Sequence, residues 1–189
     1  MARIKETVAK SKKASKRKSA SPKKSKRSPK KTSPSMKNGV KDASFRRLVK
    51  MHVNTRVSKD VYPELKKIAG QTAQAVSKEV ESMERKMKTV KAEEVKMVIE
   101  QRWGAQLGDD ELMIPKLPMQ RWIRSTFKEG TRFEKMALVE IQRFVEFLLG
   151  EVIDLAEVGR DSRGEKRMLN ASDIELSHEA LLNKLNREM

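Results

Sequence analysis

The residues of this 189-residue chain that could do chemistry are mostly cationic, and the densest group lies in residues 1–41. That stretch holds 16 Lys or Arg against one acid, Glu6. Within it the run Ser21–Lys24 (SPKK) recurs as Ser28–Lys31 and is followed by Ser33-Pro34. A Ser-Pro step followed by lysines can form a compact turn that presents cations, and the same serines fit proline-directed kinases, whose phosphate would cancel local charge. The candidate residues for DNA binding or phosphorylation are Ser21, Lys23, Lys24, Ser28, Lys30, Lys31 and Ser33.

The formal net charge of +17 belongs almost entirely to this tail. The remaining 148 residues hold 27 basic and 25 acidic groups, so the rest of the chain is nearly balanced. Residues 1–41 have too few apolar side chains to offset the entropy of ordering, and we expect a disordered basic tail. Such a tail is typical of a protein that binds polyanions, above all nucleic acid, although a nuclear-import signal or a solubilising tail has the same composition.

Several classes of function lack their signatures here. No nucleotide-binding loop, nucleophile elbow or HExxH spacing occurs, so we expect no enzyme, no catalytic residue and no cofactor. The two histidines, His52 and His178, stand on separate segments without acids spaced as metal ligands, and we expect a loop residue and a helix-surface or interface residue. Cysteine is absent, which favours an intracellular protein. No apolar run approaches the roughly 20 residues of a membrane span, and no signal-peptide core precedes the tail.

Residues 42–103 show a short–long–short helix pattern. Phe45, Leu48 and Val49 have helical spacing and predict a short helix. Apolar residues then recur in steps of three and four from Val57 to Met87, which predicts one helix of about seven turns, with Asp60 as its N-cap. A basic loop with a β-like end at Thr89-Val90 follows. A second short helix is predicted around Val95, Val98 and Ile99.

Residues 118–189 repeat the pattern after a linker at residues 104–117. Pro118 is expected to begin a short helix whose arginines, Arg121 and Arg124, can reach phosphate together. An apolar stripe from Leu138 to Leu155 predicts a second long helix, followed by another basic loop, residues 166–169. Asn170 with Asp173 three residues later is a helix-start signal. Both tryptophans, Trp103 and Trp122, fall on apolar stripes or helix ends, where core packing is favoured over base stacking. The fold class is therefore all-α.

Four runs of the first segment resemble successive blocks of histone H-four. They are Phe45–Leu48 (FRRL), Arg56–Ser58 (RVS), Val61–Glu64 (VYPE) and Lys88–Val95 (KTVKAEEV), and the match runs without a gap from Arg46 to Ala92. The chain departs from that family at the positions that meet histone H-two-B, which are Glu81, Glu84 and Met97 here. The resemblance implies that Arg56 enters the DNA minor groove from the first loop. It also implies phosphate contacts from Arg46, Arg47, Lys50, Lys86, Lys88 and Thr89.

The run Glu111–Arg124 (ELMIPKLPMQRWIR) resembles histone H-three, with Pro115 in place of a basic residue and Trp122 in place of an aliphatic one. The match resumes at Arg132-Phe133 and at Asp173–Leu176 (DIEL), after a first helix and loop that together are about three residues shorter than those of the family. Glu146–Ala156 is also similar to the long helix of histone H-two-A, including its acidic-surface positions Glu146, Glu151 and Asp154. The ungapped H-four match upstream favours the H-four/H-three pair.

We therefore expect two tandem histone folds paired head to tail within one chain. Antiparallel pairing would place the loop of Arg56 beside Lys166 and Arg167, and the loop of Arg132 beside Lys86 and Lys88. Such fusions resemble the histone doublets of Marseillevirus-type giant viruses. The resemblance implies a nucleosome-like core component that wraps double-stranded DNA without sequence specificity, in the virion and viral factory or, alternatively, in a nuclear chromosome.

The expected partners are a histone doublet similar to H-two-B/H-two-A and a second copy of this chain. The residues expected in self-association are Asp173, Leu176, His178 and Leu181. Two other functions have the same fold: a self-sufficient archaeal-type histone doublet, and a histone-fold subunit of a transcription complex.

Overall fold

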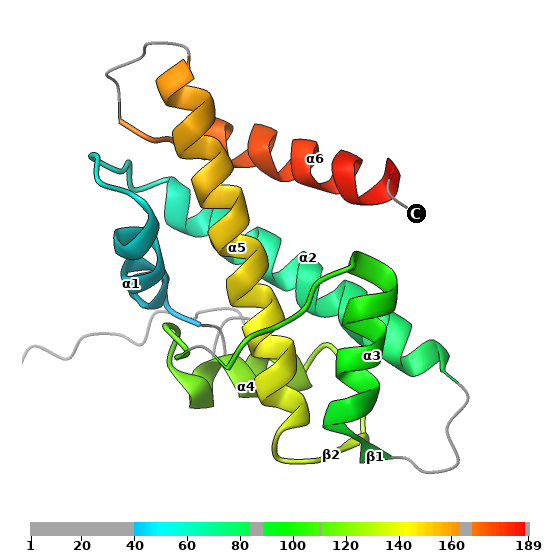
Figure 1. Cartoon of the computed structure of the whole chain (residues 1–189). Helices are drawn as coiled ribbons and strands as arrows, with labels where there is room; N and C mark the ends of the chain where they lie inside the picture. Colours follow the sequence, from blue (N-terminus) through cyan, green and yellow to red (C-terminus); the bar gives the residue numbers. More distant parts are fainter. Residues whose placement is uncertain (1–39, 84–88, 110, 163–167, 188–189) are drawn as a thin grey trace, which may run out of the picture. The chain divides into compact units, whose positions relative to one another are not determined.

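The protein is mostly helical, and its six described helices form two sets, each with a long central helix (Figure 1). The computed structural model describes residues 40–83, 89–109, 111–162 and 168–187, all of which lie in one compact unit, Pro34–Met189. The first set is α1 (Asp42–His52), α2 (Val61–Ser82), β1 (Thr89–Val90) and α3 (Ala92–Trp103). The second set is α4 (Lys116–Arg124), β2 (Arg132–Phe133), α5 (Ala137–Ser162) and α6 (Ala171–Arg187).

The two long helices share one core. Helix α5 crosses α2 (Figure 1), and each of the two packs against both short first helices, α1 and α4. Leu65 and Ile68 of α2 and Ile141 and Leu149 of α5 have no exposed surface. Because an amphipathic helix must bury its apolar face, each half covers the stripe that the other would leave in water. No helix among the described residues is long and apolar enough to cross a membrane.

The loops of the two halves meet at both ends of the pair, as predicted. At one end Val57 forms a parallel bridge with Leu169: Ser58 N donates to Leu169 O (2.8 Å) and Leu169 N donates to Arg56 O (3.0 Å). At the other end β1 pairs in parallel with β2, with Thr89 opposite Arg132 and Val90 opposite Phe133. Within the described residues, the first loop of each half thus pairs with the segment that follows the second loop of the other half, at Leu169 and at Thr89-Val90.

The helix boundaries follow the local signals, with two corrections. Helix α2 begins directly after Asp60 as predicted but ends at Ser82, and Met87 lies outside the described residues. Helix α4 begins at Lys116 rather than at Pro118. Pro118 still lies in the first turn, where a missing backbone donor costs nothing. The predicted start of α6 is confirmed: Asn170 N donates to the Asp173 carboxylate, and Asp173 N donates to the Asn170 side-chain oxygen, both at 3.1 Å.

The linker between α3 and α4 is fixed to α5. Gly104 ends α3 with a φ of 63°, a conformation that favours glycine. Further along, Met113 N and Ile114 N donate to the two carboxylate oxygens of Glu146, at 2.6 and 3.2 Å. The side-chain amide of Gln142 donates to Ile114 O at 2.8 Å. The chain entering α4 is therefore held by buried side chains of the neighbouring long helix.

Candidate nucleic-acid interface

One candidate arginine stands at each end where the loops pair. Arg56 and Arg132 are both exposed, although the backbone of each is hydrogen-bonded to the opposite half. At the Arg56 end, the pKa of Asp60 lies below its usual range because the Ser58 hydroxyl and backbone N–H groups, including that of Ala171, donate to its carboxylate. The arginine side chains are thus free in solvent while the backbone beneath them is fixed.

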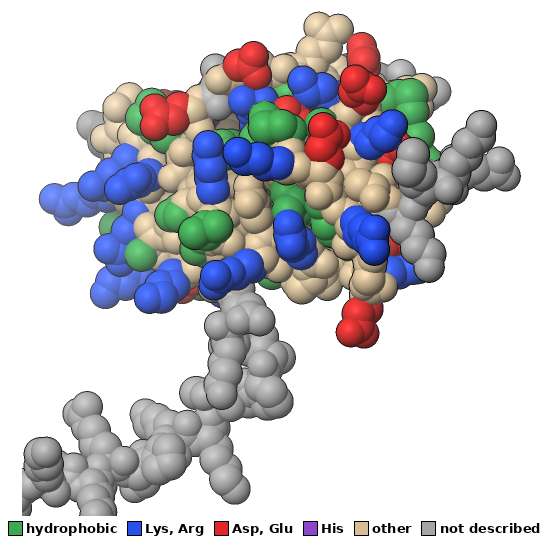
Figure 2. Space-filling view, turned by 90° about the horizontal axis from the view of Figure 1, so that it is seen from below, with side chains coloured by type: hydrophobic (Ala, Val, Ile, Leu, Met, Phe, Trp, Pro, Cys, Tyr) green, Lys and Arg blue, Asp and Glu red, His purple; other side chains and the backbone are tan. Residues whose placement is uncertain are grey.

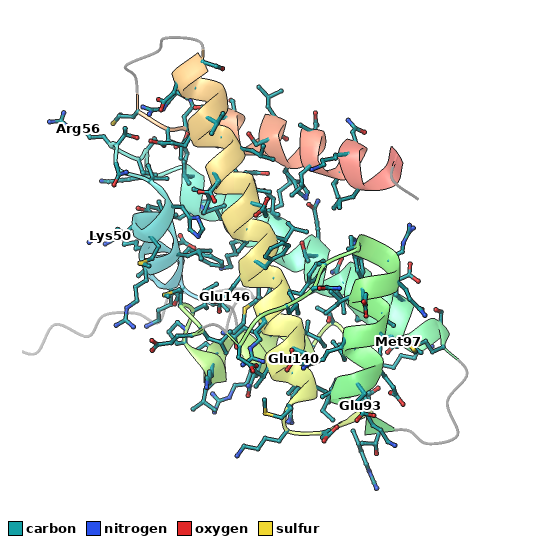
Figure 3. All side chains as sticks on the ribbon, viewed as in Figure 1. Lys50, Arg56, Glu93, Met97, Glu140 and Glu146 are labelled. Atoms are coloured by element: carbon teal, nitrogen blue, oxygen red, sulfur yellow. The ribbon has the colours of Figure 1, made fainter. Side chains whose placement is uncertain are left out.

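The short first helices carry the candidate cations between these ends. Arg46, Arg47 and Lys50 of α1 and Arg121 and Arg124 of α4 are all exposed. Figure 3 shows Lys50 and Arg56 pointing outward on the same side of the molecule. In the space-filling view from below, Lys and Arg side chains gather toward the left and lower left, the side of α1 and α4, and most Asp and Glu side chains lie elsewhere (Figure 2).

Two of these arginines rest on aromatic rings. The guanidinium carbon of Arg46 lies 5.7 Å from the centre of the Tyr62 ring, and that of Arg124 lies 5.6 Å from the centre of the Phe133 ring. Cation–π contact at this range is favourable and restricts an otherwise mobile side chain. In each half, therefore, an aromatic residue positions an arginine of the first helix. Tyr62 of α2 does so for Arg46, and Phe133 of β2 does so for Arg124.

Several candidate residues lie outside the described residues. These are the tail residues Ser21, Lys23, Lys24, Ser28, Lys30, Lys31 and Ser33, and the loop residues Lys86, Lys88, Lys166 and Arg167. Thr89, which follows the first of these loops, is half-buried and pairs with Arg132. Leu169, which follows the second, is buried against the loop of Arg56.

The prediction of an acidic surface on α5 is wrong for Glu146. That side chain is buried, at 8% exposure, where it accepts the two linker N–H groups, and burial raises its pKa. Asp154 is exposed, but its Oδ1 atom lies 2.9 Å from Nδ1 of His52 on α1. Glu151 is exposed and lines a cavity of about 320 Å³ between α1, the linker and α5. Glu146 also lines this cavity, from a buried position, whereas Asp154 contacts α1, so the three acids do not form one exposed patch.

Two of the four predicted self-association residues are buried within the chain itself. Asp173, at 2% exposure, forms the reciprocal cap at the start of α6, and Leu181, at 8%, joins the core. Leu176 is 57% exposed, and His178 is half-buried, with a pKa lowered chiefly by burial. Other exposed apolar residues, which the prediction missed, are Leu155 and Val158 on α5 and Leu182 on α6.

The remaining aromatic candidates are structural. His52 is the last residue of α1 and contacts α5, so its prediction as a loop residue is wrong. The predicted packing role of the tryptophans is confirmed: the Trp103 ring lies 4.9 Å from that of Phe144, and Trp122 packs against Gly70 of α2. Among the described residues, no three His, Asp or Glu side chains are grouped to hold a metal ion.

No protein-family model matches the sequence, and no curated protein is significantly similar to it. Conclusions about function therefore rest on the residues and their arrangement.

Proposed function

We propose that this chain is a fused pair of histone folds, H-four-like and H-three-like, that packages duplex DNA in a nucleosome-like particle. The observation that carries the proposal is the pairing of loops at both ends of the two long helices. Arg56 and Arg132 come from the first loops of the two halves, and each lies at one of these paired ends. The first helix of each half, α1 or α4, adds further exposed cations. Binding of this kind uses phosphate contacts and minor-groove arginines rather than base reading.

The chemistry of the site favours DNA over a small molecule. The candidate cations within the described residues are exposed and spread over two helices and two loops, whereas a small-molecule site needs convergent polar groups in a pocket. The basic tail adds the charge that a polyanion requires. A histone-fold transcription subunit would bind protein chiefly, and the Ser-Pro-Lys-Lys repeats favour DNA packaging over that alternative.

The decisive experiment is nuclease protection. The full chain is mixed with duplex DNA, with and without an H-two-B/H-two-A-like doublet, and digested. A discrete protected fragment with the partner only supports the proposal, and a fragment with the chain alone indicates the archaeal-type alternative. No discrete fragment in either mixture would overturn DNA wrapping.

At residue level, Arg56→Ala with Arg132→Ala is expected to weaken binding to all DNA sequences alike. Each phosphate contact that is lost should lower the slope of log K against log salt by about 0.9, so the double variant should lower it by about 2. Lys184→Ala is the matched control, because Lys184 is exposed on α6, outside the paired loops and first helices. An unchanged slope in the double variant would show that these arginines do not touch DNA.

Self-association is proposed through the end formed by α5 and α6, where Leu155, Val158 and Leu176 expose apolar surface. Helices α5 and α6 pack against each other, and exposed apolar side chains on both favour a protein partner. Val158→Glu with Leu176→Glu should therefore abolish dimers in sedimentation velocity. Met97→Glu, at an exposed apolar residue of α3, should leave them intact and serves as the control.

A further inference from the structure

Each long helix carries a glycine in its interior. Gly70 lies within α2 and Gly150 within α5. A glycine inside a helix costs about 1 kcal/mol relative to alanine, so a helix that keeps one usually has a packing reason. Neither glycine has the positive φ that would explain it, since the positive values belong to Gly104 and Gly130.

The reason is a large flat side chain from the opposite half. A Cβ atom at Gly70 would lie 3.0 Å from Cζ2 of Trp122, which projects from α4. A Cβ atom at Gly150 would lie 2.8 Å from Cε1 and 3.0 Å from Nε2 of His52, which projects from α1. Carbon contacts are optimal at about 3.5–4.0 Å, so neither position has room for a methyl group while its partner stays in place.

The two contacts are reciprocal. The first helix of the second half fills the notch in the first long helix, and the first helix of the first half fills the notch in the second long helix. The His52 ring is held in its notch from the side, because its Nδ1 atom lies 2.9 Å from the Asp154 carboxylate. Trp122 is half-buried and packs against the shared core.

We propose that the Gly70–Trp122 and Gly150–His52 notches are the contacts by which the two halves select one another. The interface around each notch fits a first helix that presents a large planar side chain at this register. A first helix with a smaller side chain at this position is disfavoured because it leaves a void. A long helix with a side chain in place of the glycine is disfavoured because that side chain clashes. The identity of the halves as histone folds rests on the proposed function, but the selectivity itself concerns pairing and needs no DNA.

A first helix with a smaller side chain in place of Trp122 would leave the Gly70 notch partly empty. Specificity is a difference between two stabilities, and a matched knob and notch raise one while lowering the other. The chain would thus keep its own halves paired in the presence of separate histone folds.

The test is a double-mutant cycle on the full chain, measured by urea unfolding in the absence of DNA. With Gly70 in place, Trp122→Leu should lower the unfolding midpoint. In a Gly70→Ala chain the effect should have the opposite sign. Trp122→Leu should then raise the unfolding midpoint, because leucine leaves room for the new methyl group. If Gly70→Ala does not fold, folding of Gly70→Ala with Trp122→Leu gives the same answer.

The second notch provides a repeat and α5 provides the control. Gly150→Ala should lower the midpoint, and His52→Ala should restore part of the loss. Gly159→Ala should leave the midpoint unchanged or raise it, because a Cβ atom there meets nothing within 4 Å. The proposal is overturned if tryptophan stays better than leucine at position 122 in both backgrounds, or if Gly70→Ala and Trp122→Leu have additive effects. Failure of DNA wrapping would leave this result untouched.

Discussion

Helices α1 and α4 hold corresponding places, since each packs across both long helices, yet they are fastened differently. Helix α4 is held at its start by Glu146 and Gln142, and beyond its end Thr126 O accepts from Ser77 Oγ at 3.2 Å. These contacts involve backbone groups of the α4 segment and buried side chains of the long helices. A hydrogen bond that leaves a buried group unsatisfied when broken is expensive to lose.

The side-chain hydrogen bonds and ion pairs of α1 are exposed instead. At its end His52 contacts Asp154, and Thr55 Oγ1 donates to Glu157 at 3.4 Å. At its start Lys66 Nζ lies 4.0 Å from the Asp42 carboxylate. Pairs exposed to water contribute little, because solvent screens them and ordering the side chains costs entropy. Helix α4 is therefore fixed by hydrogen bonds to buried side chains, whereas α1 relies on its apolar face and on the packing of His52 against Gly150.

The largest effect is expected from breaking the start of α4. Glu146→Ala would leave Met113 N and Ile114 N without acceptors beside a buried residue, since Ile114 is 1% exposed. We expect the free energy of unfolding to fall by about 2–3 kcal/mol in urea titrations. Glu151→Ala, at an exposed position of the same helix, should cost less than about 0.5 kcal/mol. Equal effects of the two variants would show that Glu146 does not hold the linker.

The same carboxylate should make stability depend on pH. Because burial raises the pKa of Glu146, the folded state binds its proton at a higher pH than the unfolded chain does. The contribution of Glu146 to the free energy of unfolding therefore falls as pH rises from the usual carboxyl range to the raised pKa, and is constant above it. The difference in stability between the wild type and Glu146→Gln, measured between about pH 4 and pH 7, should decrease over that window. A difference that increases with pH would contradict the raised pKa.

A smaller effect is expected at the other end of α4. Ser77 is 2% exposed, and its hydroxyl lies within hydrogen-bonding distance of Gln74 O and Thr126 O. Ser77→Ala should lower the free energy of unfolding by about 1 kcal/mol, the usual value of one neutral hydrogen bond. Ser82→Ala is the control, because the Ser82 hydroxyl donates to Glu79 O within its own helix and is exposed. A loss no larger than that of the control would show that Ser77 does not fasten α4.

The helices could be predicted from the sequence because they depend on local patterns. Apolar spacing predicted the long helices, and Asn170 with Asp173 predicted the start of α6, where a short-range hydrogen-bond signal has a local cause. The meeting of the loops at both ends was expected only from the resemblance to paired histone folds, because no local pattern specifies it.

The fastening of the linker could not be predicted, because it joins residues 28–33 positions apart whose types carry no local signal. Glu146 looked like a surface acid on a helix, and only the path of the linker buries it. The contacts of Gly70 and Gly150 were missed for a related reason. A glycine inside a helix indicates that another group packs closely against it, but which side chain does so depends on how the helices cross. Asp173 and Leu181 were predicted at a surface that α6 in fact turns toward its own core.

The smallest effect is expected at α1. Asp154→Asn removes the charge opposite His52 while keeping a similar shape, and 53% of the Asp154 side chain is exposed. The free energy of unfolding should change by less than about 0.5 kcal/mol, because a polar contact exposed to water contributes little. Native-state hydrogen exchange should show the same contrast between the helices, with α1 amides opening at lower free energy than α4 amides. A loss as large as that of Glu146→Ala would mean that α1 is fixed at its end as firmly as α4 is at its start.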